Sequence, residues 1–299
     1  MAVYKKTYRP YDGPLTAAWL RFTVVPKFAF ESMARSRFFR LFFLVCLIFP
    51  VFCALFVYLY HNLSALELLG LKPSNLMKIE SQFFLDYLGF QSMLAFFVAA
   101  FVGPGLVAPD LANNALPLYL SRPFSRAEYI LGKLTVLVAL LSAMTWIPGL
   151  LLYLLQGYLA GGTWMSDHAR IAAALVAGSL VWILVLSLLA LALSAWVKWR
   201  PVAGGLMFGV FFVAAGMGVV SNRVLRIRWG HLLNISHLMG SVWVDMFEEP
   251  MRRGAGAAFF RVARGEEIPV WMCWAVLSAM CAACLWLLAH RVKGVEVVR

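Results

Sequence analysis

Long apolar runs separated by shorter polar segments make up most of the sequence. Six of these runs are long enough for the hydrocarbon core of a bilayer, which takes about 20 helical residues to cross. They lie at residues 41–60, 83–102, 134–155, 171–197, 202–220 and 269–289. Backbone polar groups must be paired in lipid, and no ten-residue alternation indicates a β-barrel, so each run is predicted to be a helix. The pattern therefore predicts an all-α polytopic membrane protein, with residues 1–299 forming one transmembrane domain.

Two further segments have apolar residues at helical spacing but are too polar to cross. The first, residues 15–38, mixes aromatic and basic side chains. It is predicted to be an N-terminal amphipathic helix that lies at the membrane interface and bends at Pro26. The second, residues 232–247, is predicted to rest on the outer surface of the bundle as a lid or collar. For both segments there are two alternatives: the segment lies passively at the membrane interface, or it has a direct role in function.

The amino-acid composition also indicates a membrane protein, and this affects how the net positive charge is interpreted. Hydrophobic residues make up 63% of the chain, charged residues 13%, and the mean hydropathy is +0.81. Soluble domains have about half apolar and about a quarter charged residues. The formal net charge is +12, but in a membrane protein the distribution of charge matters more than its sum. No nucleic-acid partner is expected.

The distribution of Lys and Arg predicts the side of the membrane on which each segment lies. If the chain crosses the membrane six times, most of the basic residues fall in short segments on the same side of the membrane as the N-terminus. Most of the other basic residues fall in one long loop on the opposite side, residues 221–268. An excess of positive charge in short loops marks the cytoplasmic side. Residues 1–40 do not have the pattern of a signal peptide. Both termini are therefore predicted to be cytoplasmic.

The segment between the second and third runs, residues 104–130, is rich in proline for a connector. A short helix is predicted over residues 106–120, with Pro109 at its first position and a break at Pro117. Lys133, at the start of the third span, is predicted to extend to the headgroups. Because the predicted helix is joined closely to two spans, a force on it would move both.

The same segment carries a motif of a known family. The stretch LVAPDLANNALPLYLSRPFSRAEYILGKL resembles the cytoplasmic loop between spans two and three of type-2 ATP-binding-cassette (ABC) exporter permeases. The matching positions are Asp110 for an acidic residue, 121–123 for Ser-Arg-Pro, 125–126 for a second Ser-Arg and 131–133 for Leu-Gly-Lys. Asn114–Ala115 replaces the usual Gly-Thr, and Pro117 replaces the usual acidic residue. An N-terminal elbow helix, six spans and a long outer segment add to the resemblance.

The resemblance implies a mode of action. The loop would form a coupling helix that docks in a groove of a separate cytoplasmic ABC ATPase. Two permease subunits, identical or paralogous, would pair around a central pathway, among the lipids of a bacterial cytoplasmic membrane. The candidates for ATPase coupling are Asp110, Asn114, Leu116, Arg122 and Arg126. For the arginines the alternative is anchoring at the membrane surface, and for Asp110 it is a favourable charge at a helix start.

The chain itself lacks the residues needed to hydrolyse ATP. A phosphate-binding loop needs Gly-x-x-x-x-Gly-Lys followed by Ser or Thr. Gly132 and Lys133 are the nearest match, but Leu134 follows them and Ala127 stands at the first glycine position. The chain is therefore predicted to be a transport subunit without a cofactor, with ATP and Mg²⁺ bound by a partner.

Other candidate chemistry is sparse. Asp86 and Gln91 lie at membrane depth in the second span, where polar groups usually face the bundle or water. A proton or substrate role is one interpretation of Asp86, and a paired structural carboxylate is the other. The histidines and the five cysteines lack the spacing of a metal site, and the cysteines all lie in apolar runs.

Small residues in the fifth span predict close helix packing. Gly205 and Gly209 are four residues apart, and Gly218 follows, a pattern that lets helix backbones approach. The resemblance places this span near an interface between two permeases, and packing within one subunit is the alternative. In the third span, Pro148–Gly149 predicts a kink.

The leading hypothesis is a permease that is powered by a separate ATPase and exports a hydrophobic or amphipathic substrate. The spans carry almost no charge with which to bind a charged solute. A non-transporting mechanical, assembly or signalling subunit of an ABC-type complex would have the same connector. An integral-membrane enzyme acting on lipids is a further alternative, although no cluster of catalytic side chains is evident at one membrane surface.

Overall fold

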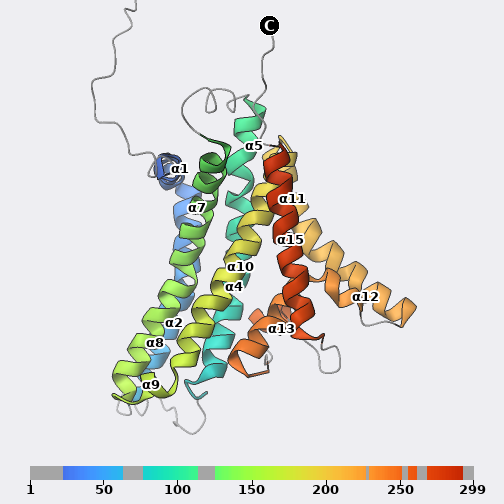
Figure 1. The fold of residues 1–299 in the computed structure, drawn as a ribbon. Helices are drawn as coiled ribbons and strands as arrows, with labels where there is room; N and C mark the ends of the chain where they lie inside the picture. The colour runs from blue at the N-terminus through green and yellow to red at the C-terminus, as the bar shows by residue number, and fades with distance from the viewer. Residues whose placement is uncertain are drawn as a thin grey trace, which may run out of the picture.

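The structure is a computed structural model that describes residues 23–62, 77–113, 125–226, 229–250, 255–260 and 268–291. Every regular element in these ranges is helical. Six continuous helical stretches in these ranges are long and apolar enough to cross a membrane, which confirms the predicted all-α class and the number of spans. They run roughly alongside one another, as Figure 1 shows, apart from one that leaves the bundle.

Three of the six spans are built from more than one helical segment. The second combines α4 and α5, the third combines α7 and α8, and the fifth combines α11, a π-helical turn η3, and α12. The bounds are α1 Val24–Arg35, α2 Arg37–His61, α4 Ser81–Val102, α5 Pro104–Ala112, α7 Arg126–Met144, α8 Trp146–Ala160, α9 Trp164–Asp167, α10 Ala169–Trp196, α11 Arg200–Phe208, η3 Gly209–Val213, α12 Ala214–Leu225, η4 Trp229–Leu233, α13 Ile235–Phe247, α14 Ala255–Phe259 and α15 Val270–Arg291.

The bundle has two distinct ends. Helices α1 and α5, the start of α7 and the end of α15 lie together at one end, called the α5 end below (Figure 1). Helix α9 and the turn between α8 and α10 lie at the opposite end, called the α9 end. The turn between α10 and α11 brings the chain back to the α5 end, where α11 packs against α5.

The N-terminal amphipathic segment is described from Thr23 onward. Helix α1 has Pro26 in its first turn, and the predicted bend at Pro26 stays a prediction. The chain changes direction at Ser36, whose extended backbone separates α1 from α2 and whose side chain accepts a hydrogen bond from the Phe39 amide at 3.3 Å. Helix α1 packs against α7 and α2. Residues 15–22 lie outside the described part of the chain.

The third span breaks three residues before its proline. Thr145 has φ −105° and ψ −88° and separates α7 from α8. Pro148 has no N–H to donate to the carbonyl of Met144, four residues earlier, and its ring crowds that carbonyl. The predicted kink at Pro148 therefore appears as a break at Thr145.

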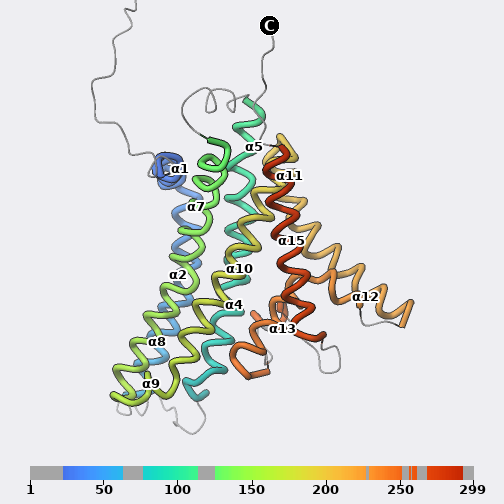
Figure 2. The backbone as a smooth tube through the Cα atoms, viewed as in Figure 1, coloured from blue at the N-terminus to red at the C-terminus, as the bar shows by residue number. Residues whose placement is uncertain are grey.

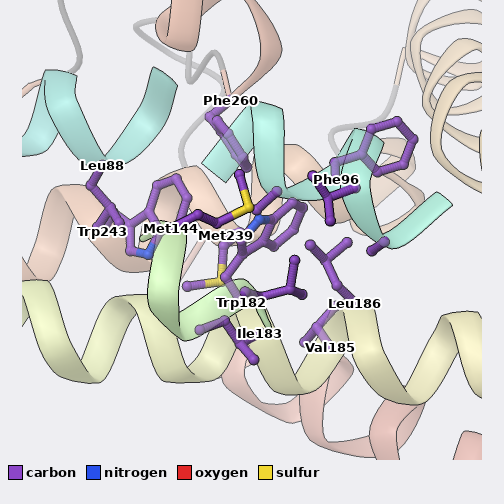
Figure 3. Packing of buried hydrophobic residues seen from close by; sticks show 14 of the residues in the cluster. Leu88, Phe96, Met144, Trp182, Ile183, Val185, Leu186, Met239, Trp243 and Phe260 are labelled. Carbon is purple, nitrogen blue, oxygen red and sulfur yellow. The ribbon is translucent and has the colours of Figure 1, made fainter. Parts of the chain in front are cut away.

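Helix α10 forms the centre of the bundle, in contact with α4, α5, α7, α8, α11, α13 and α15. Its Trp182 is completely buried and donates from Nε1 to the carbonyl oxygen of Ser92 at 2.9 Å. Figure 3 shows the Trp182 ring among side chains from several elements, including Trp243 of α13 and Phe260, which follows α14. The Trp182 and Phe260 ring centroids are 5.0 Å apart. The core thus combines residues from the spans with residues from the connector between the fifth and sixth spans.

That connector does not form the lid that the sequence predicts. Helix α13 packs against α15, α10 and α4, and its residues 235–243 are all buried. Trp243 Nε1 donates to the Gly178 carbonyl oxygen, in the interior of α10, at 3.1 Å. The small and polar residues Ser236, His237, Gly240 and Ser241 are buried along with the apolar ones. Because burial is not limited to one apolar face, the helix is inserted in the bundle rather than resting on it.

Helix α12 diverges from the rest of the bundle (Figures 1 and 2). It forms a hairpin with η4, in which the Gly218 and Gly230 backbones come into close contact. The Asn222 side chain accepts a hydrogen bond from the Gly230 amide at 2.7 Å. Apolar side chains elsewhere on α12, such as Met217 and Val220, are exposed.

Candidate coupling site

The segment that the sequence singles out begins as a direct continuation of the second span. Helix α4 ends at Val102, Gly103 keeps helical angles, and α5 starts with Pro104 as its first residue. Pro109 lies inside α5, so the prediction that it opens the helix is wrong. Pro104 takes that position because its missing N–H costs little at a helix start. A short second helix therefore extends the second span at the α5 end.

Ser194, near the end of α10, fixes the start of α5. Its Oγ accepts hydrogen bonds from the amides of Val107 at 3.3 Å and Ala108 at 2.9 Å, and it donates to the Pro104 carbonyl oxygen at 3.1 Å. In a regular α-helix the Ala108 amide would bond to the Pro104 carbonyl oxygen, four residues earlier. The Ser194 hydroxyl bonds to both of these groups, so the central span is joined to the first turns of α5.

Asp110 fixes the other half of α5, through side chains of α7. Its Oδ2 accepts a hydrogen bond from the Tyr129 hydroxyl at 2.7 Å and lies 2.8 Å from Lys133 Nζ. The Lys133 side chain is only 11% exposed and the Asp110 side chain 17%. Lys133 therefore does not extend to the headgroups as predicted, because a carboxylate lies within reach inside the protein.

The start of α7 is held by its own cap. Ser125 accepts a hydrogen bond from the Glu128 amide, and the Glu128 side chain accepts one from the Ser125 amide, which together form a capping box. Arg126, the first residue of α7, is exposed. The other candidates in the connector, Asn114, Leu116 and Arg122, lie in residues 114–124, outside the described part of the chain.

Three residues of this site were missed from the sequence: Tyr129, Lys133 as a partner of Asp110, and Ser194. A signal for the ion pair was present. Two opposite charges flanked the boundary of adjacent spans, and ionisable groups near membrane depth usually pair with one another. No comparable signal exists for Ser194, because a serine in an apolar span has no pattern that names its partner.

The two intramembrane polar candidates lie elsewhere in α4. Asp86 accepts a hydrogen bond from Gln82 Nε2 at 3.0 Å. Gln91 is fully buried and donates from Nε2 to the Cys46 carbonyl oxygen of α2 at 3.0 Å. The structure thus places Gln91 in a contact between the first and second spans, and it does not bring either residue to the α5 end.

The glycines of the fifth span lie in two different environments. A Cβ atom at Gly205 or Gly209 would have no described atom within 4 Å. A Cβ atom at Gly218 would collide with the Gly230 backbone. Gly218 therefore serves packing within the subunit, and the Gly205–Gly209 face is open in the single chain.

The described residues do not show a site for a metal or a nucleotide. No group of three or more His, Cys, Asp or Glu side chains in the described ranges has the geometry of a metal site. Gly132 and Lys133 lie inside α7 as regular helix, and both are buried. A phosphate-binding loop needs backbone amides that are free to point at the phosphates, so this stretch has the wrong geometry for one.

Comparison with known proteins gives the family. A family model described as ABC-2 family transporter protein matches residues 23–231. This range includes the first five spans and the whole connector, and it confirms the resemblance seen in that connector. No curated protein matches the chain. Proteins of this membrane family are transport subunits rather than ATPases and imply a partner ABC ATPase. The chain therefore belongs to the ABC-2 transporter family and is a membrane permease component of an ABC-2 type transporter.

Proposed function

We propose that this permease works as a dimer that is driven by a separate cytoplasmic ATPase, and that it exports a hydrophobic or amphipathic substrate. The observation that supports this most is the attachment of α5. Three spans meet there, because α5 continues the second, is capped by Ser194 of the fourth and is paired through Asp110 with the third. A protein that docks against the connector between α5 and α7 would act on all three.

The charge of the described residues supports a cytoplasmic location for the α5 end. The exposed basic residues at this end are Lys27, Arg35, Arg37, Arg40, Arg126, Lys198, Arg200 and Arg291. Acidic residues predominate near the α9 end, with Glu80, Asp167, Asp245, Glu248 and Glu249. Positive charge marks the cytoplasmic side. The connector would then face the compartment that contains ATP.

At the start of α7, where the connector ends, the exposed Arg126 is a candidate for contact with an ATPase carboxylate. Asn114, Leu116 and Arg122 are further candidates through the family motif. Leu116 would be an apolar anchor and Arg122 a second basic contact. Asp110 already has two partners within the chain, so its contribution is proposed to be indirect.

The open glycine face supports pairing of two permeases through the fifth span. Gly205 and Gly209 lie on one face of α11 and η3 with no described neighbour within 4 Å. Exposed apolar residues nearby include Leu206, Phe212 and Val213. In lipid, small residues allow close helix contact, which is how such faces are usually buried.

The low charge of the spans supports the proposed substrate class. The central core is aromatic and aliphatic, as Figure 3 shows. Of the charged residues near the spans, Asp110 and Lys133 are already paired with each other. A charged solute would have little to bind at membrane depth, whereas a lipid-like or drug-like molecule would not need such groups.

Two measurements test this proposal. Affinity purification of the tagged permease from native membranes should recover an ABC ATPase, and this complex in liposomes should hydrolyse ATP faster when its substrate is present. Absence of any ATPase from the purified complex would refute the proposed function. A complex that hydrolyses ATP but moves none of a panel of fluorescent lipids and amphipathic dyes would favour the mechanical or assembly role.

A further inference from the structure

We propose that Lys133 is a positioning residue for energy coupling, and that Asp110 acts through Lys133 rather than by contact with the ATPase. The ion pair joins α5 to α7, so that both ends of the connector belong to one rigid unit. This inference rests on the proposed function for its mechanical meaning. Its structural part concerns the permease alone.

The pair is placed where the two helices would otherwise separate. Asp110 lies in the last turn of α5, and Lys133 lies about two turns into α7. Tyr129, one turn before Lys133 on the same face of α7, donates to the same carboxylate oxygen. Lys133 Nζ also lies 5.5 Å from the centre of the Tyr129 ring. One carboxylate thus holds two successive turns of α7.

Burial makes this contact stronger than an ordinary surface ion pair. Both side chains are less than one-fifth exposed, so water and salt screen their attraction only weakly. Loss of one partner would leave the other charge buried without compensation, which is strongly destabilising. Separation of α5 from α7 would lose this weakly screened attraction together with the Tyr129 hydrogen bond to the same carboxylate. The two helices are therefore expected to move together.

The connector between α5 and α7 is attached to both of the helices that the ion pair joins. It leaves α5 at Asn113, three residues after Asp110, and enters α7 at Arg126, seven residues before Lys133. With the ion pair intact, a force on the connector displaces α5 and α7 as one unit. Without the pair, the same force would be absorbed by a change in the angle between the two helices, and less of it would reach the spans.

The first test uses the permease alone in lipid nanodiscs. Spin labels at exposed Asn113 and Ala127, introduced as cysteines after replacement of the native cysteines, report the α5–α7 distance by electron–electron resonance. The expected result is a narrow distribution in the parent protein and a distinctly broader one in Lys133→Met. Asp110→Asn with Lys133→Met removes both charges, which avoids a buried unpaired carboxylate, and should also broaden it. The matched control Lys198→Met, at the exposed turn between α10 and α11, should not.

The second test uses the complex with the ABC ATPase that co-purifies from native membranes. The double variant should assemble with the ATPase in normal yield, whereas Lys133→Met, which leaves a buried unpaired carboxylate, should assemble in lower yield and is compared per assembled complex. In the parent complex, the permease changes the rate of ATP turnover from that of the ATPase alone. In both variants this change should be about tenfold smaller, which is within the usual range for coupling between two sites. Lys198→Met should couple as the parent does. The exchange Asp110→Lys with Lys133→Asp should restore part of the effect, because it rebuilds the pair.

The outcomes separate the two proposals. Distance distributions as narrow as the parent's in both Lys133→Met and the double variant would overturn the inference and leave the proposed function standing. Broad distributions with unchanged coupling would also overturn it, because α5 and α7 would then not need to be joined. Recovery of no ATPase with the parent protein would overturn the proposed function, while the distance measurement would still decide whether the pair joins the two helices.

Discussion

Gly103, at the junction of α4 and α5, packs so tightly against α10 that a Cβ atom on it would lie only 2.5 Å from the Ala190 Cβ. The same Cβ would lie 2.7 Å from the Ala99 carbonyl oxygen. Only glycine permits this approach. This close approach of Gly103 to α10 places the start of α5 within hydrogen-bond distance of Ser194.

Gly103→Ala is therefore expected to destabilise the permease by about 1–3 kcal/mol, the usual cost of inserting a methyl group into a packed contact. The measurement is the midpoint of thermal unfolding in detergent. Gly105→Ala is the matched control on the same helix, because its Cβ would meet nothing closer than Arg200 Cζ at 3.9 Å. Alanine favours helix over glycine, so this control should be neutral or stabilising. Equal melting temperatures for the two variants would contradict the tight contact.

Ser194→Ala should also weaken the attachment of α5. The substitution removes the acceptor for two amides and a donor to the Pro104 carbonyl oxygen. Buried polar groups that lose their partner cost about 1–3 kcal/mol each. We expect a lower melting temperature and faster deuterium exchange at Val107 and Ala108.

Ser187 offers the control for this experiment. It is buried on the same helix, and its Oγ has no hydrogen-bond partner within the described ranges. Ser187→Ala should change the stability by less than Ser194→Ala does, or raise it. If both serine variants melt alike, hydrogen bonding by Ser194 would not be what holds α5.

Two contacts between α10 and α13 should differ in strength. At Gly178 a Cβ atom would lie 2.9 Å from Trp243 Cδ1, so Gly178→Ala should displace α13 at a cost of about 1–3 kcal/mol. Arg170 pairs with Glu248 at the exposed end of α13, where the side chains are 59% and 69% exposed. Arg170→Gln should cost about 1 kcal/mol or less. Deuterium exchange of the α13 amides measures both, and a larger effect from Arg170→Gln would refute the insertion of α13.

Dimer formation can be tested at the open glycine face. Gly205→Leu with Gly209→Leu should leave the subunit folded, because neither Cβ has a described neighbour within 4 Å. If two fifth spans meet there, the dimer should dissociate about tenfold more readily, which corresponds to about 1.4 kcal/mol. Native mass spectrometry measures the dimer fraction. Ala283→Leu, on the exposed face of α15, is the control, and a dimer that tolerates the glycine changes would place the interface elsewhere.

The spans could be predicted from the sequence because lipid imposes a length and an apolar composition on any helix that crosses it. The insertion of α13 could not be predicted in this way. Its stripe of Leu238, Val242 and Trp243 predicts one buried face, but the burial of Ser236 and Ser241 depends on how closely α15 and α4 approach. Hydrophobic spacing does not contain that information.

The location of the candidate coupling site could be proposed from the sequence, but its internal contacts could not. The family motif indicated the connector and Asp110. The pairing of Asp110 with Lys133 joins residues on either side of a loop, and Ser194 comes from a span far along the chain. Such contacts depend on the relative placement of helices, which a single sequence does not specify. The motif suggested that Asp110 faces a partner protein, whereas its carboxylate is engaged by side chains of α7.

The π-helical turn at Gly209–Val213 holds one more residue than the α-helical turn that it replaces. Deleting any single residue within it would allow α11 and α12 to join as an uninterrupted α-helix. Because the π turn holds the extra residue within one turn, this deletion would leave the rotation of α12 about the helix axis nearly unchanged. A deletion in the regular turn of α12 before Gly218 would instead rotate Gly218 by about 100°. Gly218 would then turn away from Gly230, and the hairpin with η4 would lose its closest contact. The π-helical turn is thus the place in the fifth span where a shortening by one residue would preserve the neighbours that the helix touches.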